Sequence, residues 1–344
     1  MEARKHITQG GLNNSATQLV PENSIAIITR VGVGKLAFMP FSYTTSQDFL
    51  SLSKLNTEPF FTVYACYKKL QSELNAVQGT SIKGITKDEL LAKKIMVPKY
   101  AEQQEIGAFF RNLDHFITLH QRKYDKLTNV KKSMLEKMFP ENGETVPKIR
   151  FKGFFDAWEQ RKLGEVADIT SGFMGNSLLS DGKFRLTRIE TIADGIVDES
   201  RVGYSNIQPE DRYLLKKGDI LYSNINSISH MGKVAKYEGK SALYHGINLL
   251  RLSPNNTILS DFLLQMLNTE NKRNWAKSHA NQAVSQASIN QSLLASQDIF
   301  VCSLKEQKAI GDFLTVLDNL ITLHQCKLEK LKNIKKACLE KMFV

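Results

Sequence analysis

The sequence predicts an α+β protein with two mixed-sheet globular domains and two long helices, arranged as a pseudo-two-fold repeat. Residues 102–139 and 306–343 align without a gap, and 23 of their 38 positions are identical. Within each copy, apolar residues recur at alternating steps of four and three, as in a coiled coil. Upstream of each copy, the chain changes to short β-rich runs separated by Gly, Asn, Asp and Pro.

The heptad pattern predicts the two long helices. Neither Pro nor an interior Gly interrupts it beyond the first turn, and about 33 residues at about 1.5 Å each extend over roughly 48 Å. Two such helices in one chain can pack on each other. The positions that form the expected packing face are Ile106, Phe110, Leu113, Ile117, His120, Tyr124, Leu127, Ile310, Leu314, Leu317, Ile321, His324, Leu328 and Leu331.

Four β-rich runs precede the helices, at residues 24–39, 58–67, 183–197 and 218–225. They are typical of irregular mixed sheets with long loops. The repeat continues weakly into these regions. Residues 79–98 align with 283–302 at the same offset of 204, and VGKLA at 33–37 matches MGKVA at 231–235.

Each half is therefore a variable globular domain followed by a shared helix. The predicted boundaries are 1–101 for the first domain, 102–139 for its helix, 140–147 for a linker, 148–305 for the second domain and 306–344 for its helix. The linker is polar and bracketed by prolines. Aligning residues 18–27 with 213–222 places Met1 opposite about residue 196, so we expect the first domain to lack about 48 residues at its amino-terminal side.

Composition limits the class of protein. The net charge of +11 suggests an acidic partner, nucleic acid first, although no segment carries a dense basic block. The four cysteines, Cys66, Cys302, Cys326 and Cys338, show neither a C-x-x-C pair nor zinc-site spacing. The chain has no apolar run of about 20 residues, and its amino terminus lacks the apolar core of a signal peptide. We therefore expect a cytoplasmic protein without a disulfide framework or a structural metal.

Catalytic motifs are missing from the sequence. We find no amino-methylation motif, no metal-dependent nuclease motif, no H-E-x-x-H and no G-x-S-x-G. GVGK at 32–35 resembles part of a phosphate loop, but Leu36 stands where a magnesium-binding Ser or Thr is required. His120 and His324 lie on the helix packing face, where a polar residue usually sets register. We therefore expect no catalytic residue and no metal site.

Polar loops of the globular domains provide a stronger functional signal. Residues 186–195 and 221–233 interleave Arg, Asn, Ser, Thr and His with Gly, and residues 78–87 and 282–291 add further amides and hydroxyls. Such side chains suit hydrogen bonding to phosphates and base edges, although ordinary solvated loops have a similar composition.

Three segments carry a resemblance to a known family, at residues 147–172, 216–235 and 303–332. The first is similar to the opening of a target recognition domain, the second to its middle and the third to the helical region that follows. With these segments the sequence resembles the specificity subunits of type I restriction-modification systems. The resemblance implies two target recognition domains separated by two long antiparallel coiled-coil helices. Each domain would read one half of a bipartite double-stranded DNA site, and the helices would dock methyltransferase subunits, two in all.

The resemblance also implies a chain that is non-catalytic by itself and binds no cofactor directly. S-adenosylmethionine would be used by the methyltransferase subunits, and ATP and Mg by restriction subunits that join through the complex. On this basis the candidate DNA-contacting residues are Arg185, Thr187, Arg188, Ser223, Asn224, Asn226, Ser229, His230, Lys233 and Gln286 in the second domain, with Arg30, Lys35, Thr45, Gln47, Ser81 and Lys83 in the first.

Alternatives remain open at this point. The first domain departs from the family pattern, because it has no counterpart of FDAWEQRKLGEV at 155–166 or of RLTRIETIADG at 185–195. A clipped start, a fragment produced by recombination, or a split subunit completed by another chain would each explain this. The rival functions are a non-catalytic coiled-coil scaffold, an inactive fragment of a specificity subunit, and a self-contained nuclease or methyltransferase.

An antiparallel pair of helices makes one geometric prediction. Equivalent residues near the centres of two helices related by a pseudo-two-fold axis come close together. We therefore expect the side chains of His120 and His324 to lie within about 12 Å of each other.

Overall fold

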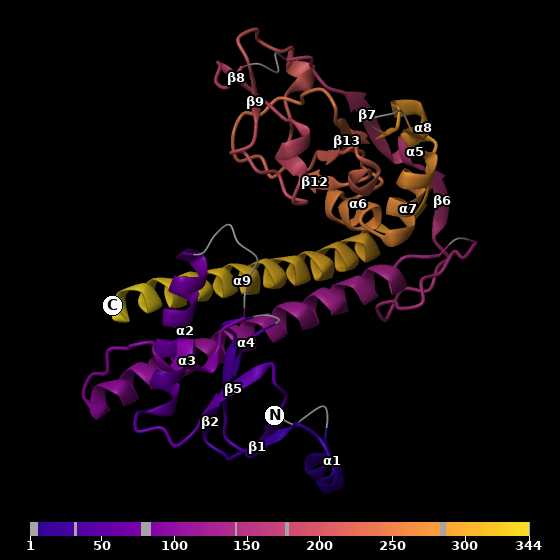
Figure 1. Ribbon diagram of the computed structural model, residues 1–344. Helices are drawn as coiled ribbons and strands as arrows, with labels where there is room; N and C mark the ends of the chain where they lie inside the picture. The colour runs from indigo at the N-terminus through magenta and orange to yellow at the C-terminus, as the bar shows by residue number, and fades with distance from the viewer. Residues whose placement is uncertain are drawn as a thin grey trace. The chain divides into compact units, whose positions relative to one another are not determined.

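The computed structural model describes residues 6–30, 33–76, 84–141, 143–175, 179–282 and 287–343. The chain divides into two compact units. The first contains Met1–Tyr124 and Leu323–Val344, and the second contains Asp125–Thr322. The long helices α4 (Tyr100–Lys137) and α9 (Leu304–Met342) each contribute one part to either unit (Figure 1).

The first unit is built on a three-stranded antiparallel sheet of order β3-β2-β5, with a separate ribbon of β1 and β4. Its elements before α4 are α1 (Gln9–Asn13), β1 (Gln18–Val20), β2 (Ser24–Ile28), β3 (Leu36–Met39), β4 (Tyr43–Thr45), β5 (Phe49–Leu52), α2 (Pro59–Ala76) and α3 (Lys87–Leu91).

The second unit is built on a four-stranded antiparallel sheet of order β12-β10-β13-β7, with smaller sheets β6-β16, β8-β9 and β11-β15-β14. Its strands are β6 (Glu159–Lys162), β7 (Ala167–Ser171), β8 (Phe184–Leu186), β9 (Gly203–Ser205), β10 (Ile220–Tyr222), β11 (Ile225–Asn226), β12 (Val234–Lys236), β13 (Leu250–Pro254), β14 (Asn281–Gln282), β15 (Ala287–Ser288) and β16 (Asp298–Val301). Its helices besides α4 and α9 are α5 (Leu163–Val166), α6 (Ser260–Leu267), α7 (Glu270–His279), α8 (Gln291–Ala295) and the 3-10 turns η1 (Ile189–Ile192), η2 (Asp211–Tyr213) and η3 (Ile228–His230).

The two sheets repeat the same local plan. Ile25 lies opposite Leu52 in the first sheet, as Ile220 lies opposite Leu252 in the second. The turn before each of these strands needs a left-handed residue, which is Asn23 at φ 58° in one unit and Gly218 at φ 97° in the other. The α+β class predicted from the sequence is therefore confirmed, with the repeat extending into the sheets.

The prediction of a β-rich run at residues 58–67 is wrong, because all of its residues from Pro59 onward lie in helix α2. Its aromatic and β-branched composition favours a strand. The burial pattern is helical, however, with Phe61, Tyr64 and Ala65 buried against α4 at steps of three and one. Pro59 at the first helical position and the good helix formers after Tyr67 continue the helix.

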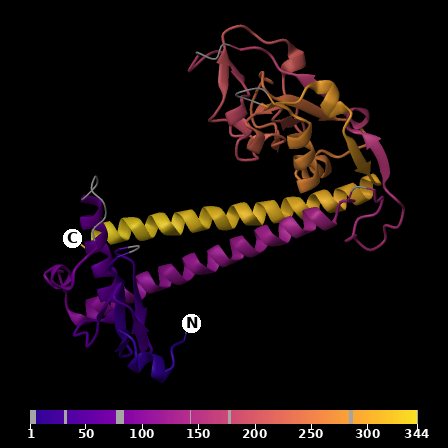
Figure 2. The same cartoon turned by 45° about the vertical axis from the view of Figure 1, so that its right-hand side comes forward.

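The two long helices run antiparallel within each unit (Figure 2). In the first unit, Nδ1 of His120 lies 2.8 Å from Nδ1 of His324, and Lys335 donates to Asp114 over 2.5 Å. In the second unit, Lys131 donates to Asp318 over the same distance. Lys131 and Lys335 are equivalent positions of the repeat, as are Asp114 and Asp318. The prediction that the two histidines lie close together is confirmed.

The predicted packing positions differ in what covers them. Ile106, Phe110 and Leu113 pack against α2 as well as against Leu331 and Leu339 of α9. Equivalent positions of α9 pack against α6 in the second unit. The fully buried members are Ile106, Phe110, Leu113, Ile310, Leu314, Leu317 and Leu328, and the half-buried ones are Ile117, His120, Tyr124, Leu127, Ile321, His324 and Leu331.

A glutamine fixes the start of each long helix. Gln103 accepts a hydrogen bond from the amide of Glu58 (3.0 Å) and donates to the carbonyl of Pro98 (2.8 Å). Gln307, its equivalent, accepts from the amide of Leu259 and donates to the carbonyl of Cys302, both over 2.8 Å. Both helices begin two residues earlier than the sequence predicts and also end earlier. The predicted domain boundaries themselves stay predictions.

Candidate nucleic-acid interface

An exposed polar turn follows strand β11 of the second unit. Asn226 Oδ1 accepts the amide of Ser227 over 2.8 Å, and the hydroxyls of Ser227 and Ser229 lie 2.8 and 3.1 Å from Nδ1 of His230. Ser227, Ser229 and His230 are all exposed. The local hydrogen bonds hold these side chains in place on η3, so the turn presents hydroxyl and imidazole groups to solvent.

Buried polar residues support this turn. Ser223 is 1% exposed and its amide donates to the carbonyl of Lys233 over 2.8 Å, while Asn226 donates to the Ser223 hydroxyl over 3.1 Å. Asn224, also buried, donates to the carbonyl of Ile289 over 3.0 Å. Ser223 and Asn224 therefore shape the loop from within, and in this conformation they have little surface for contacting DNA.

Lys233 joins the turn to the neighbouring loop. Its ammonium group donates to the carbonyl of Ala193, at the end of η1, over 2.7 Å. The preceding Gly232 has φ 73°, and a Cβ atom there would lie 2.8 Å from the Cβ of Ala276 in α7. Glycine is required at this position, because it lets the loop press against the helix.

A cavity of about 230 Å³ opens beside η1. Arg188, Glu190 and Asn248 contribute polar groups to its wall, and Phe173 and Tyr204 contribute aromatic rings. Gly203 lies so close to Arg188 that a Cβ atom there would meet the guanidinium group at 2.2 Å. The residues thus combine a guanidinium, a carboxylate, an amide and two rings, which are the groups that hydrogen bond to and stack on nucleic-acid bases.

Thr187 lines the same cavity but is 1% exposed. Its hydroxyl accepts a hydrogen bond from the amide of Gly246 over 2.9 Å. A Cβ atom on Gly246 would lie 2.1 Å from the carbonyl oxygen of Thr187, so the two backbones approach closely. Thr187 positions the cavity wall and has almost no free surface.

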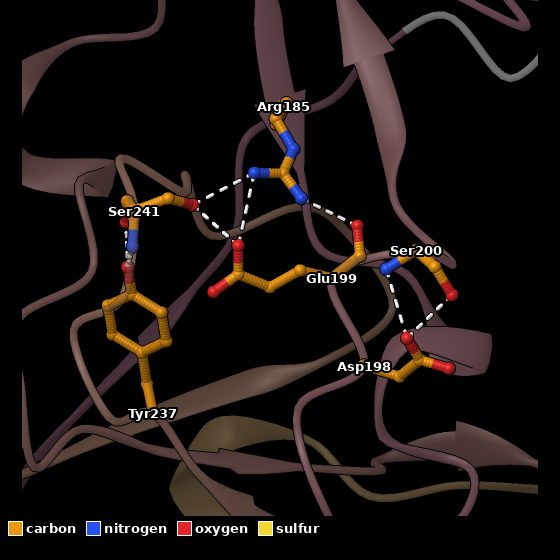
Figure 3. A network of polar contacts seen from close by, with 6 residues as sticks. All are labelled: Arg185, Asp198, Glu199, Ser200, Tyr237 and Ser241. Carbon is orange, nitrogen blue, oxygen red and sulfur yellow. Dashed lines mark hydrogen bonds and ion pairs between the residues drawn. The ribbon is translucent and has the colours of Figure 1, made fainter.

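Arg185 belongs to a polar network (Figure 3). Its guanidinium pairs with the Glu199 carboxylate over 3.1 Å, donates to the Glu199 carbonyl over 2.5 Å and donates to the Ser241 hydroxyl over 2.8 Å. Ser241 also donates to Glu199 over 2.6 Å and accepts from Tyr237 at its carbonyl. This network joins β8 to the loop before β9 and to the loop after β12. Its geometry assigns Arg185 a structural role in the conformation described.

Asp198 stabilises the adjoining turn. Its carboxylate accepts from the hydroxyl of Ser200 over 2.7 Å and from the Ser200 amide over 3.0 Å. These hydrogen bonds lower the pKa of Asp198 below its ordinary value, because they favour the charged form.

The candidates of the first unit are dispersed. Arg30 is exposed and forms an ion pair with Asp48 at 3.5 Å. Lys35 and Gln47 are exposed, and Thr45 is half-buried in β4. Ser81, Lys83 and Gln286 lie outside the described residues. The DNA-contact assignments of both units stay predictions.

The fold brings Phe173, Tyr204 and Asn248, which were not among the predicted candidates, to the cavity of Arg188. They come from three separate segments of the chain and share no motif. Pairing of β8 with β9 places Tyr204 opposite Arg185, and a bridge joins Phe173 to Gly246, two residues before Asn248.

Among the residues that the structure describes, no cluster of three or more His, Cys, Asp or Glu residues could hold a metal ion. The helices of the same residues include none with the length and apolar character needed to cross a membrane.

The sequence matches a known family in both halves. The family described as type I restriction modification DNA specificity domain matches residues 2–129 and 156–333. The chain therefore belongs to this family, which is described as one of DNA specificity domains.

Relatives carry corresponding names. The putative type I restriction enzyme MjaX specificity subunit of Methanocaldococcus jannaschii is 42% identical over 192 residues, which cover 54% of this chain and 45% of that protein. The type I restriction enzyme MjaVIII specificity subunit of the same organism is 24% identical over 337 residues, covering 92% and 77%. The match to the first relative thus spans less than half of that protein's length.

Solved structures share the fold. The specificity subunit of a type I restriction-modification system from M. genitalium is 18% identical, with a TM-score of 0.60 over 94% of this chain and 83% of that one. A chain from a structure of an assembled type I restriction-modification system is also 18% identical, with a TM-score of 0.53 over 96% and 84%. Similarity at this level shows that the chain has the same fold as these two structures.

Proposed function

We propose that the chain is the DNA-recognition subunit of a type I restriction-modification complex. It reads a bipartite site on double-stranded DNA and docks methyltransferase subunits. The observation that carries this proposal is the match of the DNA specificity family to two segments, each of which joins a globular part to its long helix. This division follows the internal repeat of the sequence, so each half of the protein serves one half of the DNA site.

The second unit contains the better-defined set of candidate residues for recognising one half of the DNA site. Its η3 turn exposes Ser229 and His230, and the nearby loop carries Arg188 on the wall of the cavity. Arg188 is the residue we assign to base-edge contact, because a guanidinium can donate two parallel hydrogen bonds to guanine. We assign an indirect role, the positioning of these loops, to Arg185, Thr187, Ser223 and Asn224.

The long helices are the proposed docking sites for two methyltransferase subunits. Their sequences stay alike while the globular parts diverge, with 23 identical positions in 38. Two similar helices offer two similar surfaces, whereas divergent domains read different half-sites. The partner subunits would bind S-adenosylmethionine, and restriction subunits that join the complex would bind ATP and Mg, so the chain itself needs no cofactor.

The test uses the chain reconstituted with its methyltransferase. Single-molecule sequencing of methylated adenines in the host gives the site, and a labelled duplex with that site is titrated against the complex. Arg188→Ala should weaken or relax recognition of one half-site by about 1 to 3 kcal/mol. The control is Arg212→Ala, which removes an exposed arginine of the same unit that stacks on Tyr213.

Equal affinity and specificity for the wild type and Arg188→Ala would contradict the assignment of Arg188. DNA retention that is independent of sequence, with methyltransferase present, would contradict the proposed function and favour a coiled-coil scaffold.

A further inference from the structure

A continuous segment of the second unit, Glu159–Ser171, completes two sheets at once. Its first strand, β6, pairs antiparallel with β16, and its last strand, β7, pairs antiparallel with β13 at the edge of the central sheet. The intervening turn of helix, α5, packs against α8, where a Cβ atom on Gly164 would lie 2.9 Å from the Cβ of Ala295. We call Glu159–Ser171 the edge segment.

The first unit contains both surfaces that such a segment would cover. Strand β5 corresponds to β13, because Leu52 faces Ile25 as Leu252 faces Ile220. Residues 94–97 correspond to β16 at the repeat offset of 204, and α3 corresponds to α8 at the same offset. In the part of the chain that the structure describes, β5 pairs only with β2, and residues 94–97 pair with no strand.

Burial differs sharply between the equivalent positions. Ile299 and Val301 of β16 are 0% and 8% exposed, whereas Ile95 is half-buried and Val97 is 49% exposed. Met96 is 80% exposed. Residues 94–97 keep the alternation of β16, with Ile95 directed toward the core cluster of the first unit. An extended segment that pairs with no strand of the described residues and has exposed apolar side chains is a template for an added strand.

Charge identifies the kind of strand that fits. In the second unit, Asp298 lies opposite Lys162 and forms an ion pair with it at 2.7 Å. The equivalent of Asp298 in the first unit is Lys94, which is exposed, whereas its neighbour Lys93 is paired with Glu73. A strand that pairs in the register of β6 therefore needs an acidic residue opposite Lys94. The edge segment of a second copy would place Lys162 there, and like charges directly opposite are unfavourable.

We propose that the first unit binds a strand–turn–strand segment from outside residues 6–343 along β5 and residues 94–97, and that this segment has an acidic residue opposite Lys94. One added strand extends the sheet at β5, and the other pairs antiparallel with residues 94–97. The apolar side chains of Met96 and Val97 become covered, as Phe300 and Val301 are in the second unit. This inference rests on the comparison of the two units and is independent of DNA recognition.

The test uses the full chain and a fluorescent peptide of its own residues 156–172, with and without the Lys162→Glu change. Binding is followed by fluorescence anisotropy. The Lys162→Glu peptide should bind about five-fold more tightly than the parent peptide, because an attractive pair replaces a repulsive one. In the chain variant Lys94→Glu the preference should reverse. The control Lys240→Glu changes an equally exposed lysine of the second unit and should leave the preference unchanged.

Two further measurements keep the test decisive. In the second unit Gly164 faces the small residue Ala295, whose equivalent in the first unit is Leu91. The chain variant Leu91→Ala restores a small residue at this position, so it should bind the parent peptide at least as tightly as the wild type does. Hydrogen exchange should slow at residues 49–52 and 94–97 when the peptide binds.

The proposal would be overturned if neither peptide bound to the wild type or to the Leu91→Ala variant. It would also be overturned if the two peptides bound with the same relative affinity to the wild type and to the Lys94→Glu variant. Self-association of the chain that Met96→Asp abolishes would overturn it in favour of a second copy at this edge.

Discussion

The ion pair between Arg150 and Glu306 provides the sharpest test of how the second unit is held together. Glu306 stands at the start of α9 with a side chain that is 1% exposed, and Arg150 is 12% exposed. Two hydrogen bonds of 2.7 and 2.9 Å join the guanidinium to the carboxylate. Glu102, the equivalent residue of α4, is exposed. The repeat therefore supplies a matched control at the same helix position.

The expected effect follows from burial of the charges. Glu306→Gln leaves the guanidinium of Arg150 without its counter-charge, and breaking a buried pair costs about 3 to 5 kcal/mol. We expect about 3 kcal/mol, the lower end, because Arg150 still donates to the carbonyl of Asp156 over 2.7 Å. For Glu102→Gln we expect a change of no more than about 0.5 kcal/mol.

The assay is urea unfolding followed by tryptophan fluorescence. The two tryptophans, Trp158 and Trp275, both belong to the second unit, so the signal reports on that unit. With a slope of about 2 kcal/mol/M, Glu306→Gln should lower the midpoint by about 1.5 M. Because Glu102 belongs to the first unit, the effect of Glu102→Gln is measured by hydrogen exchange along α4. A difference of less than about 1 kcal/mol between the loss caused by Glu306→Gln in the second unit and the loss caused by Glu102→Gln in the first would refute this account of the ion pair.

Three further predictions concern the core, a buried histidine and a loop. Phe110→Ala should destabilise the first unit by about 3 to 5 kcal/mol, because Phe110 is 0% exposed, whereas its 40% exposed neighbour Phe109 should tolerate alanine at a cost below about 1 kcal/mol. Hydrogen exchange along α4 measures both, and equal effects would contradict the assigned burial. Burial lowers the pKa of His245 to about 4, so protonation opposes folding. Stability of the second unit should be constant above about pH 6.5 and fall by about 3 kcal/mol between there and pH 4. An NMR titration of the His245 ring with a midpoint near pH 6.5 would rule this out. Gly232→Ala should cost at least about 1 kcal/mol, because φ is 73° there and Ala276 lies against the site. Urea unfolding measures this cost, and an unchanged midpoint would mean that the loop adapts.

The long helices were predictable from the sequence because their pattern is local and repeated. Apolar steps of four and three determine which face is buried, and two copies of the pattern reveal the pairing. The contact of His120 with His324 followed from that register alone. The run at residues 58–67 was not predictable from composition, because its partner Phe110 lies about 50 positions away and makes a helical face favourable there.

The candidate DNA site was only partly predictable. The loops at 186–195 and 221–233 contain the polar turn and part of the cavity wall, and their contact with DNA stays a prediction. Which polar residues face outward depends on partners that lie far along the chain. Arg185 is held by Glu199 and Ser241, and Thr187 by Gly246. No local pattern marks these partners.

The sequence by itself determined the repeat, the two helices and the family, and it predicts nucleic acid as the class of partner. These depend on periodicity and on identity between segments, which can be read without coordinates. Only the tertiary structure decided that Arg185 is held by Glu199 and Ser241, which rings line the cavity of Arg188, and that among the described residues no strand pairs with the second edge of β5 or with residues 94–97. The physical reason is that burial and strand pairing depend on residues that folding brings together, and these partners cannot be read from the order of residues along the chain.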